Sequence, residues 1–277
     1  MLKSPPDTQI IEAGRSRARI WSDLWRYREL LFFLSWRDIL VRYKQTVLGI
    51  LWSVLRPLLT MLIFTVLFGR LARLPSDNVP YPLLVLAAMV PWQFFAGSIS
   101  EAGNSLIGNA NLIAKVFFPR LVIPMATTLV TLVDAGISFL LLLGLMISYG
   151  TLPDWRILFL PFVVLPAYLL ALGCGLWFSA LNIRYRDFRH LIPFLVQVGL
   201  YVSPVGYAST IIPGKWRLIY ALNPMVGIID SFRWILLHGR TQLYMPGLAV
   251  SAALIALIFI SGLLYFRRVE RTFADII

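Results

Sequence analysis

Charged residues and cysteines are scarce in this sequence of 277 residues. Asp, Glu, Lys and Arg make up 14% of it, against about 25% in an ordinary soluble domain, while 59% of the residues are hydrophobic. Both departures argue against a soluble domain and favour a chain that is surrounded mostly by lipid. The single cysteine, Cys174, excludes a disulfide within the chain and argues against a cysteine-based metal site.

Motifs for covalent chemistry are also missing. The sequence has no G-x-x-x-x-G-K-[ST] loop to hold nucleotide phosphates, and no G-x-S-x-G, H-E-x-x-H or G-x-G-x-x-G motif. His190 and His238 are distant in sequence and have no carboxylate at metal-ligand spacing. We therefore expect no catalytic residue, no metal site and no cofactor in this chain, which leaves a membrane enzyme as a weak alternative.

Acidic residues are few, and the resulting excess of positive charge bears on which partner the chain binds. The 13 Asp and Glu stand against 25 Lys and Arg, a formal net charge of +12. A nucleic-acid-binding protein would gather this charge on one solvated face. Here much of the charge borders apolar runs, so we expect a phospholipid membrane as the partner and no nucleic acid.

Six stretches are apolar enough to cross a bilayer, which takes about 17–25 residues. They predict an all-α integral membrane protein with spans at residues 47–71, 81–100, 121–149, 157–183, 191–207 and 248–266. With residues 1–46 and 267–277 placed inside, the inner segments carry 17 Lys and Arg and the outer loops carry 7, with Arg56 completing the total. The positive-inside rule therefore predicts a multi-pass protein of the cytoplasmic membrane with both termini in the cytoplasm.

The segment before the first span has a different pattern. At 100° per residue, one arc of roughly 60° holds six apolar or aromatic residues. They are Trp21, Trp25, Phe32, Trp36, Ile39 and Tyr43. This pattern predicts an amphipathic helix along the inner membrane surface. The alternative is a soluble helix that packs on a small N-terminal domain.

The outer loop at 208–246 contains two short apolar pieces, at 216–222 and 225–237, on either side of Asn223-Pro224. They predict two half-length helices that enter the outer leaflet. Irregular backbone is tolerated at that depth only where protein or a water-filled cavity covers it. The pattern therefore indicates a cavity near the outer side.

Two charges fall inside predicted spans, Arg56 and Asp134. Because a charge within a membrane is costly, each is a candidate functional residue. Arg56 could line a wet passage, or its side chain could extend to the cytoplasmic edge or make a structural pair. Asp134 could pair with Arg56 or help to relay protons, as an ion-coupled carrier would need. Such a carrier should also show two related halves, and no internal repeat is visible.

Aromatic residues form 14% of the chain, and most should lie in interface belts or packing. Some could instead line a passage, since the apolar faces of sugar rings stack on aromatic rings. The candidates within spans are Trp52, Phe64, Phe68, Trp92, Phe94, Phe95, Tyr168, Trp177, Phe178 and Tyr201.

Several short segments, in order, make the chain resemble the type-2 ABC transporter permeases, especially the exporters of lipid-linked O antigen, capsular polysaccharide and teichoic acid. The first set is Arg37-Asp38-Ile39, Arg42-Tyr43-Lys44, 48–52 (LGILW) and Leu55-Arg56-Pro57-Leu58. The second set is Asn111-Leu112-Ile113, 115–120 (KVFFPR), Ile123-Pro124 and 184–188 (RYRDF). The last set is Ser203-Pro204-Val205, Tyr207, Asn223-Pro224-Met225 and Arg233.

The resemblance implies six membrane helices, a passage between two copies of the chain, and two separate ATPase subunits that bind ATP and Mg. It assigns residues 109–120 as a cytoplasmic coupling helix, for which a plain connector is the alternative, and 216–237 as outer gate helices. The implied ATPase-coupling residues are Arg37, Arg42, Asn109, Asn111, Lys115, Phe117, Phe118, Pro119 and Arg120. The implied gate residues are Ser203, Pro204, Tyr207, Trp216, Tyr220, Asn223 and Pro224.

From these features we expect a permease subunit that exports a lipid-linked polysaccharide. Closure of the ATPase pair would tilt the coupling helices and open the seam between the two copies. Arg56 and aromatic residues would form the passage, among them Trp52, Phe64, Trp92, Phe94, Phe95, Tyr168, Trp177 and Tyr201. A type-2 ABC exporter of a drug or a small lipid is the closest alternative.

Overall fold

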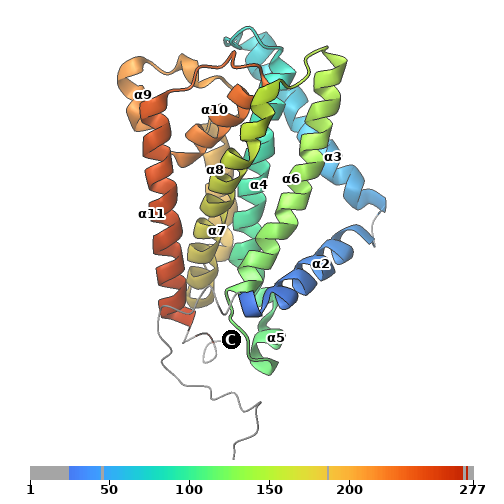
Figure 1. Ribbon diagram of the computed structural model, residues 1–277, viewed down its shortest axis with the longest axis vertical. Coiled ribbons are helices and arrows are strands. Elements are labelled where there is room, and N and C mark those ends of the chain that lie inside the picture. Colours follow the sequence, from blue (N-terminus) through green and yellow to red (C-terminus); the bar gives the residue numbers. More distant parts are fainter. Residues whose placement is uncertain (1–24, 45–46, 186, 271–272, 274–277) are drawn as a thin grey trace, which may run out of the picture.

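The computed structural model describes residues 25–44, 47–185, 187–270 and 273, and every regular element in that part of the chain is helical (Figure 1). The elements are α2 (Arg28–Lys44), α3 (Val47–Phe64), the π-helix η2 (Thr65–Leu71), α4 (Tyr81–Gly108), α5 (Ala110–Lys115), α6 (Val122–Ser148), η3 (Trp155–Phe159), α7 (Leu160–Arg184), α8 (Phe188–Val202), η4 (Ser209–Ile211), α9 (Gly214–Tyr220), α10 (Pro224–Leu236) and α11 (Met245–Val269). The predicted all-α class is confirmed for these residues.

Five helices in the described residues are long and apolar enough to cross a membrane. They cover Leu51–Leu71, Tyr81–Gly108, Val122–Ser148, Trp155–Arg184 and Met245–Val269. These match five of the six predicted spans, although α4 continues beyond residue 100 to Gly108. That extension is held by the neighbouring helix, because the amide of Asn182 on α7 donates a hydrogen bond of 2.9 Å to the carbonyl of Gly103.

The remaining predicted span, at 191–207, is wrong in its C-terminal end. The helix there, α8, has 15 residues and ends at Val202, before Ser203-Pro204. At a rise of 1.5 Å per residue it is roughly 23 Å long, which is less than the hydrocarbon core of about 30 Å. Proline ends the helix because it has no N–H to donate and disfavours helical geometry in the residue before it.

Proline also fixes where several helices begin. α4, α7, α10 and α11 each carry proline in the first turn, at Pro82, Pro161, Pro224 and Pro246. The first-turn N–H groups have no partner within a helix, and the fixed φ of proline already suits helical geometry. These residues therefore set the starts of four helices without loss of a hydrogen bond.

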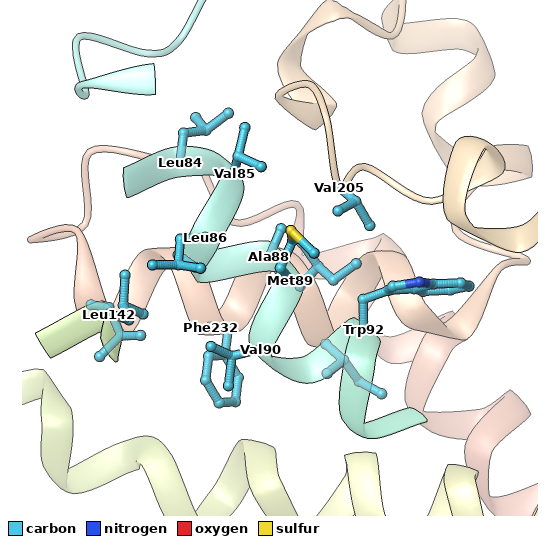
Figure 2. Packing of buried hydrophobic residues seen from close by; sticks show 14 of the residues in the cluster. Leu84, Val85, Leu86, Ala88, Met89, Val90, Trp92, Leu142, Val205 and Phe232 are labelled. Atoms are coloured by element: carbon cyan, nitrogen blue, oxygen red, sulfur yellow. The ribbon is translucent and has the colours of Figure 1, made fainter. Parts of the chain in front are cut away.

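Helix α4 is the centre of the bundle. It packs against α3, α6, α7, α8 and α10. Residues 83–88 of this helix are fully buried. Figure 2 shows Leu84, Val85, Leu86 and Ala88 in one cluster with Leu142 of α6, Phe232 of α10 and Val205. This part of α4 is apolar on every side and is enclosed by the other helices of the bundle.

Helices α7 and α11 cross with almost no clearance. A Cβ atom at Gly173 would lie 2.7 Å from the Cα atom of Phe259, and one at Gly262 would lie 2.4 Å from the carbonyl oxygen of Gly173. Small residues let two backbones approach this closely. The resulting van der Waals contacts stabilise the helix pair, because the hydrophobic effect does not drive association between helices in lipid.

The bundle has two distinct ends (Figure 1). One, which we term the α5 end, holds α5, the start of α6 and the end of α11. The other, the α9 end, holds α9 and α10. α2 lies obliquely near the α5 end and packs on α6 and α3.

Two faces of α2 meet different surroundings. Phe32 and Trp36 are 69% and 51% exposed, as is Trp25 just before α2 at 71%, whereas Leu34 is buried with residues of α6. Trp21, the first aromatic residue of the predicted helix, lies outside the described residues. Tyr43 departs from the predicted apolar face, because its hydroxyl contacts Asp134.

Candidate functional site

A polar cavity of about 670 Å³ lies between α2, α3, α4, α6 and α8. Its wall combines charged, hydroxyl and amide groups with a few apolar side chains. The lining residues are Arg42, Tyr43, Ser53, Arg56, Pro57, Thr60, Met89, Trp92, Gln93, Ala96, Gly97, Ser100, Glu101, Thr131, Asp134, Ala135, Ser138, Pro193, Val196, Gln197 and Leu200. A hydrogen bond of 2.6 Å between Ser98 and Thr131 joins α4 to α6 beside it.

An ion-pair network crosses this cavity from three helices. The Arg42 guanidinium at the end of α2 donates to Oδ2 of Asp134 on α6, and its Nη2 lies 2.6 Å from Oε1 of Glu101 on α4. The Tyr43 hydroxyl donates to Oδ1 of Asp134, so both carboxylate oxygens are used. Sequence analysis gave Arg56 as a candidate partner for Asp134, and this was wrong: Arg56 lines the same cavity, but the contacts of Asp134 come from α2.

The phenol of Tyr43 is held in its neutral form. Burial raises its pKa well above the ordinary value of 10.0, and the hydrogen bond to Asp134 raises the pKa further. A neutral phenol keeps its proton and therefore remains a donor to the carboxylate.

Few of the aromatic residues predicted for a passage line this cavity. Trp92 does, and Phe95 packs against it with ring centroids 5.7 Å apart. Phe64 and Phe94 are buried in the core, Tyr168 packs against it, and Trp177 stacks on Tyr265 at 4.3 Å. These four rings take part in packing within the chain, because neighbouring helices cover them. Trp52 and Tyr201 are exposed on the outside of α3 and α8.

Of the other two candidates, Phe68 forms an edge-to-face pair with Phe64, and Phe178 packs near Phe188. Phe68 also lies against Gly206, where an added Cβ would be 2.8 Å from the ring. The π-helix η2, which follows α3, is thereby packed against the segment after α8.

The predicted coupling segment forms the tip of the α5 end. Asn111 and Lys115 are exposed on α5, and Phe117 is 73% exposed, whereas Phe118 is only 6% exposed. Val116 has extended backbone geometry, so successive side chains after it point to opposite sides. Phe118 packs with Leu106 and Phe266 and anchors the segment, which leaves Phe117 as its exposed apolar group.

Two contacts tie this segment to other helices. Nη2 of Arg37 on α2 donates a 3.2 Å hydrogen bond to Oδ1 of Asn109, and Arg37 also pairs with Asp38. After Pro119, the backbone N–H of Arg120 donates to Oε1 of Glu270 at 2.9 Å, and its guanidinium donates to the Glu270 carbonyl at 2.7 Å. Burial raises the pKa of Glu270, while the hydrogen bond and the charge of Arg120 oppose this.

At the α9 end, the predicted gate residues form two contacts. The Asn223 side chain accepts from the Met225 N–H at 3.1 Å, capping α10, and donates to Oγ of Ser203 at 2.9 Å. The hydroxyls of Tyr207 and Tyr220 lie 2.9 Å apart. Pro204 is buried, Pro224 begins α10 and Trp216 is exposed on α9.

Arg233 makes further contacts at the α9 end. Sequence analysis noted this residue only as part of a motif. Its side chain is fully buried on α10 and donates to three carbonyl groups. They belong to Leu84 at 3.1 Å, Tyr207 at 2.9 Å and Val205 at 3.2 Å. Arg233 therefore joins α10, the central helix α4 and the segment after α8. The only signal in the sequence was a lone arginine within an apolar run.

Apolar helices that surround a charged, hydroxyl-rich cavity define this chain as a multi-pass membrane protein of the transport class. The chain belongs to the ABC-2 type transporter family, whose model matches residues 29–237. It is similar to the O-antigen export system permease protein RfbA of Myxococcus xanthus, at 31% identity over 91% of this chain and 97% of that protein.

Two further relatives extend the comparison. The O-antigen export system permease protein RfbA of Klebsiella pneumoniae is 31% identical over 90% of this chain and 95% of that protein. The polysialic acid transport protein KpsM of Escherichia coli is 23% identical over 73% of this chain and 79% of that protein.

Proposed function

We propose that this chain is the membrane permease subunit of an ABC exporter that carries a lipid-linked polysaccharide outward across the cytoplasmic membrane. The observation that carries the proposal is the similarity to O-antigen export permeases along nine-tenths of the chain. The polar cavity among apolar helices supports it, because the hydroxyl groups of a sugar need hydrogen-bonding partners inside a membrane. Gln93, Gln197 and Ser100 supply such groups.

The proposed orientation places the α5 end in the cytoplasm. The charge distribution supports this, because Arg37, Lys115, Arg120 and Arg267 follow or precede spans at that end. In this arrangement α8 and the segment up to Tyr207 make the sixth crossing. α2 and the end of α11 both lie toward the α5 end, which an even number of crossings requires (Figure 1).

A separate ATPase is the proposed source of energy, since the sequence has no nucleotide-binding loop of its own. Two ATPase subunits, each with ATP and Mg, would dock on the coupling segments of two permease copies. The support is the shape of that segment: Phe117 and Lys115 are exposed at its tip, while Phe118 and Arg120 hold it to the bundle.

The proposed passage includes the cavity and the seam between two copies. Arg56 and Trp92 contribute from the cavity wall, and the exposed Trp52 and Tyr201 from the outer surfaces of α3 and α8. Ring faces on this path could hold a sugar chain loosely, because each stacking contact resembles the next. The outer helices α9 and α10 would form the gate.

A cavity-filling variant tests the proposal in the cell. Deletion of the gene should remove the polysaccharide from the cell surface and leave lipid-linked polymer inside, and the unaltered chain should restore export. Thr60→Trp, which fills the cavity, should behave like the deletion. The matched control is Gly144→Trp on α6, where an added side chain meets open space, and it should export normally.

The alternative is an exporter of a drug or small lipid with the same fold. It predicts that the deletion leaves surface polysaccharide unchanged and raises drug sensitivity. That result would contradict the proposed substrate.

A further inference from the structure

The end of α2 forms part of the cavity wall, which its predicted place along the membrane surface does not explain. Arg42 and Tyr43 belong to the last turn of α2, and both line the cavity. Their partner Asp134 lies roughly 18 Å along α6 from the start of that helix, at 1.5 Å per residue. The end of α2 therefore reaches well into the bundle.

Asp134 makes the contacts that fix the last turn of α2 in place. Its two carboxylate oxygens accept from two different side chains of α2, and Arg42 continues to Glu101 on α4. Hydrogen bonds between charged groups are the stronger kind, and a carboxylate among apolar helices needs them to offset the cost of its burial. About a third of each side chain of the Arg42–Asp134 pair is accessible from the cavity, so water can replace the contacts when the helices separate.

A second contact connects α2 to the coupling segment. Arg37 lies five residues before Arg42 on the same helix and donates to Asn109, the residue between α4 and α5. A displacement of α5 therefore acts on α2 directly. The same helix thus links the surface proposed for the ATPase to the cavity.

We propose that Asp134 is a positioning residue that holds the last turn of α2 against the cavity wall, and that release of Arg42 and Tyr43 opens the cavity to the substrate from the α5 end. This inference rests on the proposed function for its substrate, but the movement itself is independent of which molecule is carried. ATPase movement at α5 supplies the displacement through Arg37.

Thiol labelling measures this opening without any polysaccharide. The complex of permease and ATPase, with Cys174→Ala to remove the native thiol, carries Thr60→Cys as a reporter in the cavity. The probe is a charged, membrane-impermeant maleimide applied from the α5 side in vesicles. Arg268→Cys, exposed in the last turn of α11 and outside the coupling segment, reports reagent access and should label equally in every variant.

Asp134→Asn should raise the labelling rate of the cavity reporter by about tenfold, the effect of losing one charge-assisted contact. Tyr43→Phe removes only the hydroxyl group and should raise the rate by a few-fold. Glu29→Gln, which removes an exposed acid from the first turn of α2, is the matched control and should leave the rate unchanged.

Unchanged labelling in both Asp134→Asn and Tyr43→Phe, in complexes with parental thermal stability, would overturn the inference. If labelling responds as expected while the deletion leaves surface polysaccharide intact, the positioning role holds and the proposed substrate fails.

Discussion

Arg233 illustrates how a single charge can organise one end of the molecule. Its guanidinium lies in the interior of the α9 end, where it donates to carbonyl groups of Leu84, Val205 and Tyr207. The segment after α8 has few backbone partners of its own at this point, so these bonds replace those that regular helix would supply. A fully buried arginine is therefore the structural centre of the proposed outer gate.

Replacement of this side chain should be costly. Arg233→Ala leaves three carbonyl groups without their donor and should lower the free energy of unfolding by roughly 3 kcal/mol or more. Thermal unfolding of the purified protein in detergent measures the loss. The control is Arg240→Ala, since Arg240 is exposed and donates to a single carbonyl group, that of Asn78 at 3.1 Å. Equal unfolding temperatures for the two variants would contradict this account.

Individual residues also show what sequence alone could predict. Asp134 stood out as a lone acid in an apolar run, but its partners could not be identified, because Arg42 lies 92 residues earlier in a segment that was interpreted as interfacial. Phe117 and Phe118 have the same chemistry and adjacent positions. Only the extended backbone after α5 decides which ring is exposed and which is buried.

At the scale of elements, the coupling segment combines an exposed tip with a buried anchor. Phe117→Ala removes apolar surface that nothing in the described chain covers, so the fold should be unaffected while binding of the ATPase subunit weakens. Phe118→Ala should instead destabilise the permease, by roughly 3 kcal/mol, as for other buried phenylalanines. Thermal unfolding and co-purification with the ATPase, measured for both variants, separate the two effects.

The opposite pattern would refute this division. If Phe117→Ala lowered the unfolding temperature and left the complex intact, Phe117 would serve packing and not recognition. Leu158→Ala on η3 is the control, because it removes an equally exposed apolar side chain away from the coupling segment, and it should change neither measurement.

Helices were predicted best where apolar length alone defines them. The spans at 121–149 and 248–266 correspond to α6 and α11 with small differences at their ends. α4 was predicted too short, because residues 101–108 are polar enough to suggest a loop, while Asn182 on another helix stabilises them. The end of α8 was placed too late, since the apolar pattern continues through Ser203-Pro204 although the helix does not.

For the whole molecule, the two ends should lie on opposite sides of the membrane. In a Cys174→Ala background, Lys215→Cys on α9 should react with an impermeant maleimide in intact cells, and Ala114→Cys on α5 only in inside-out vesicles. The reason is that charged ends flank apolar helices long enough to separate two aqueous phases. Reaction of both positions from one side would refute the six-crossing arrangement.

Composition was sufficient to predict the class of molecule, but not the cavity. An excess of apolar residues and a scarcity of charge already indicated a membrane protein. The cavity needs side chains from five helices that lie up to 158 residues apart in sequence, from Arg42 to Leu200, and no local pattern encodes their meeting. Ten aromatic residues were named as candidates for a passage, and of these only Trp92 lines the cavity, because periodicity cannot separate a ring that faces a neighbouring helix from one that faces water.

The close crossing of α7 and α11 has a mechanical consequence. The backbones of α7 and α11 are in close contact at Gly173 and Gly262. We therefore expect the two helices to move as one rigid unit. Arg120 is hydrogen-bonded to Glu270 at one end of this pair of helices, and α10 packs against the pair at the other end. We therefore expect a displacement at the α5 end to move α7 and α11 together and to reach α10.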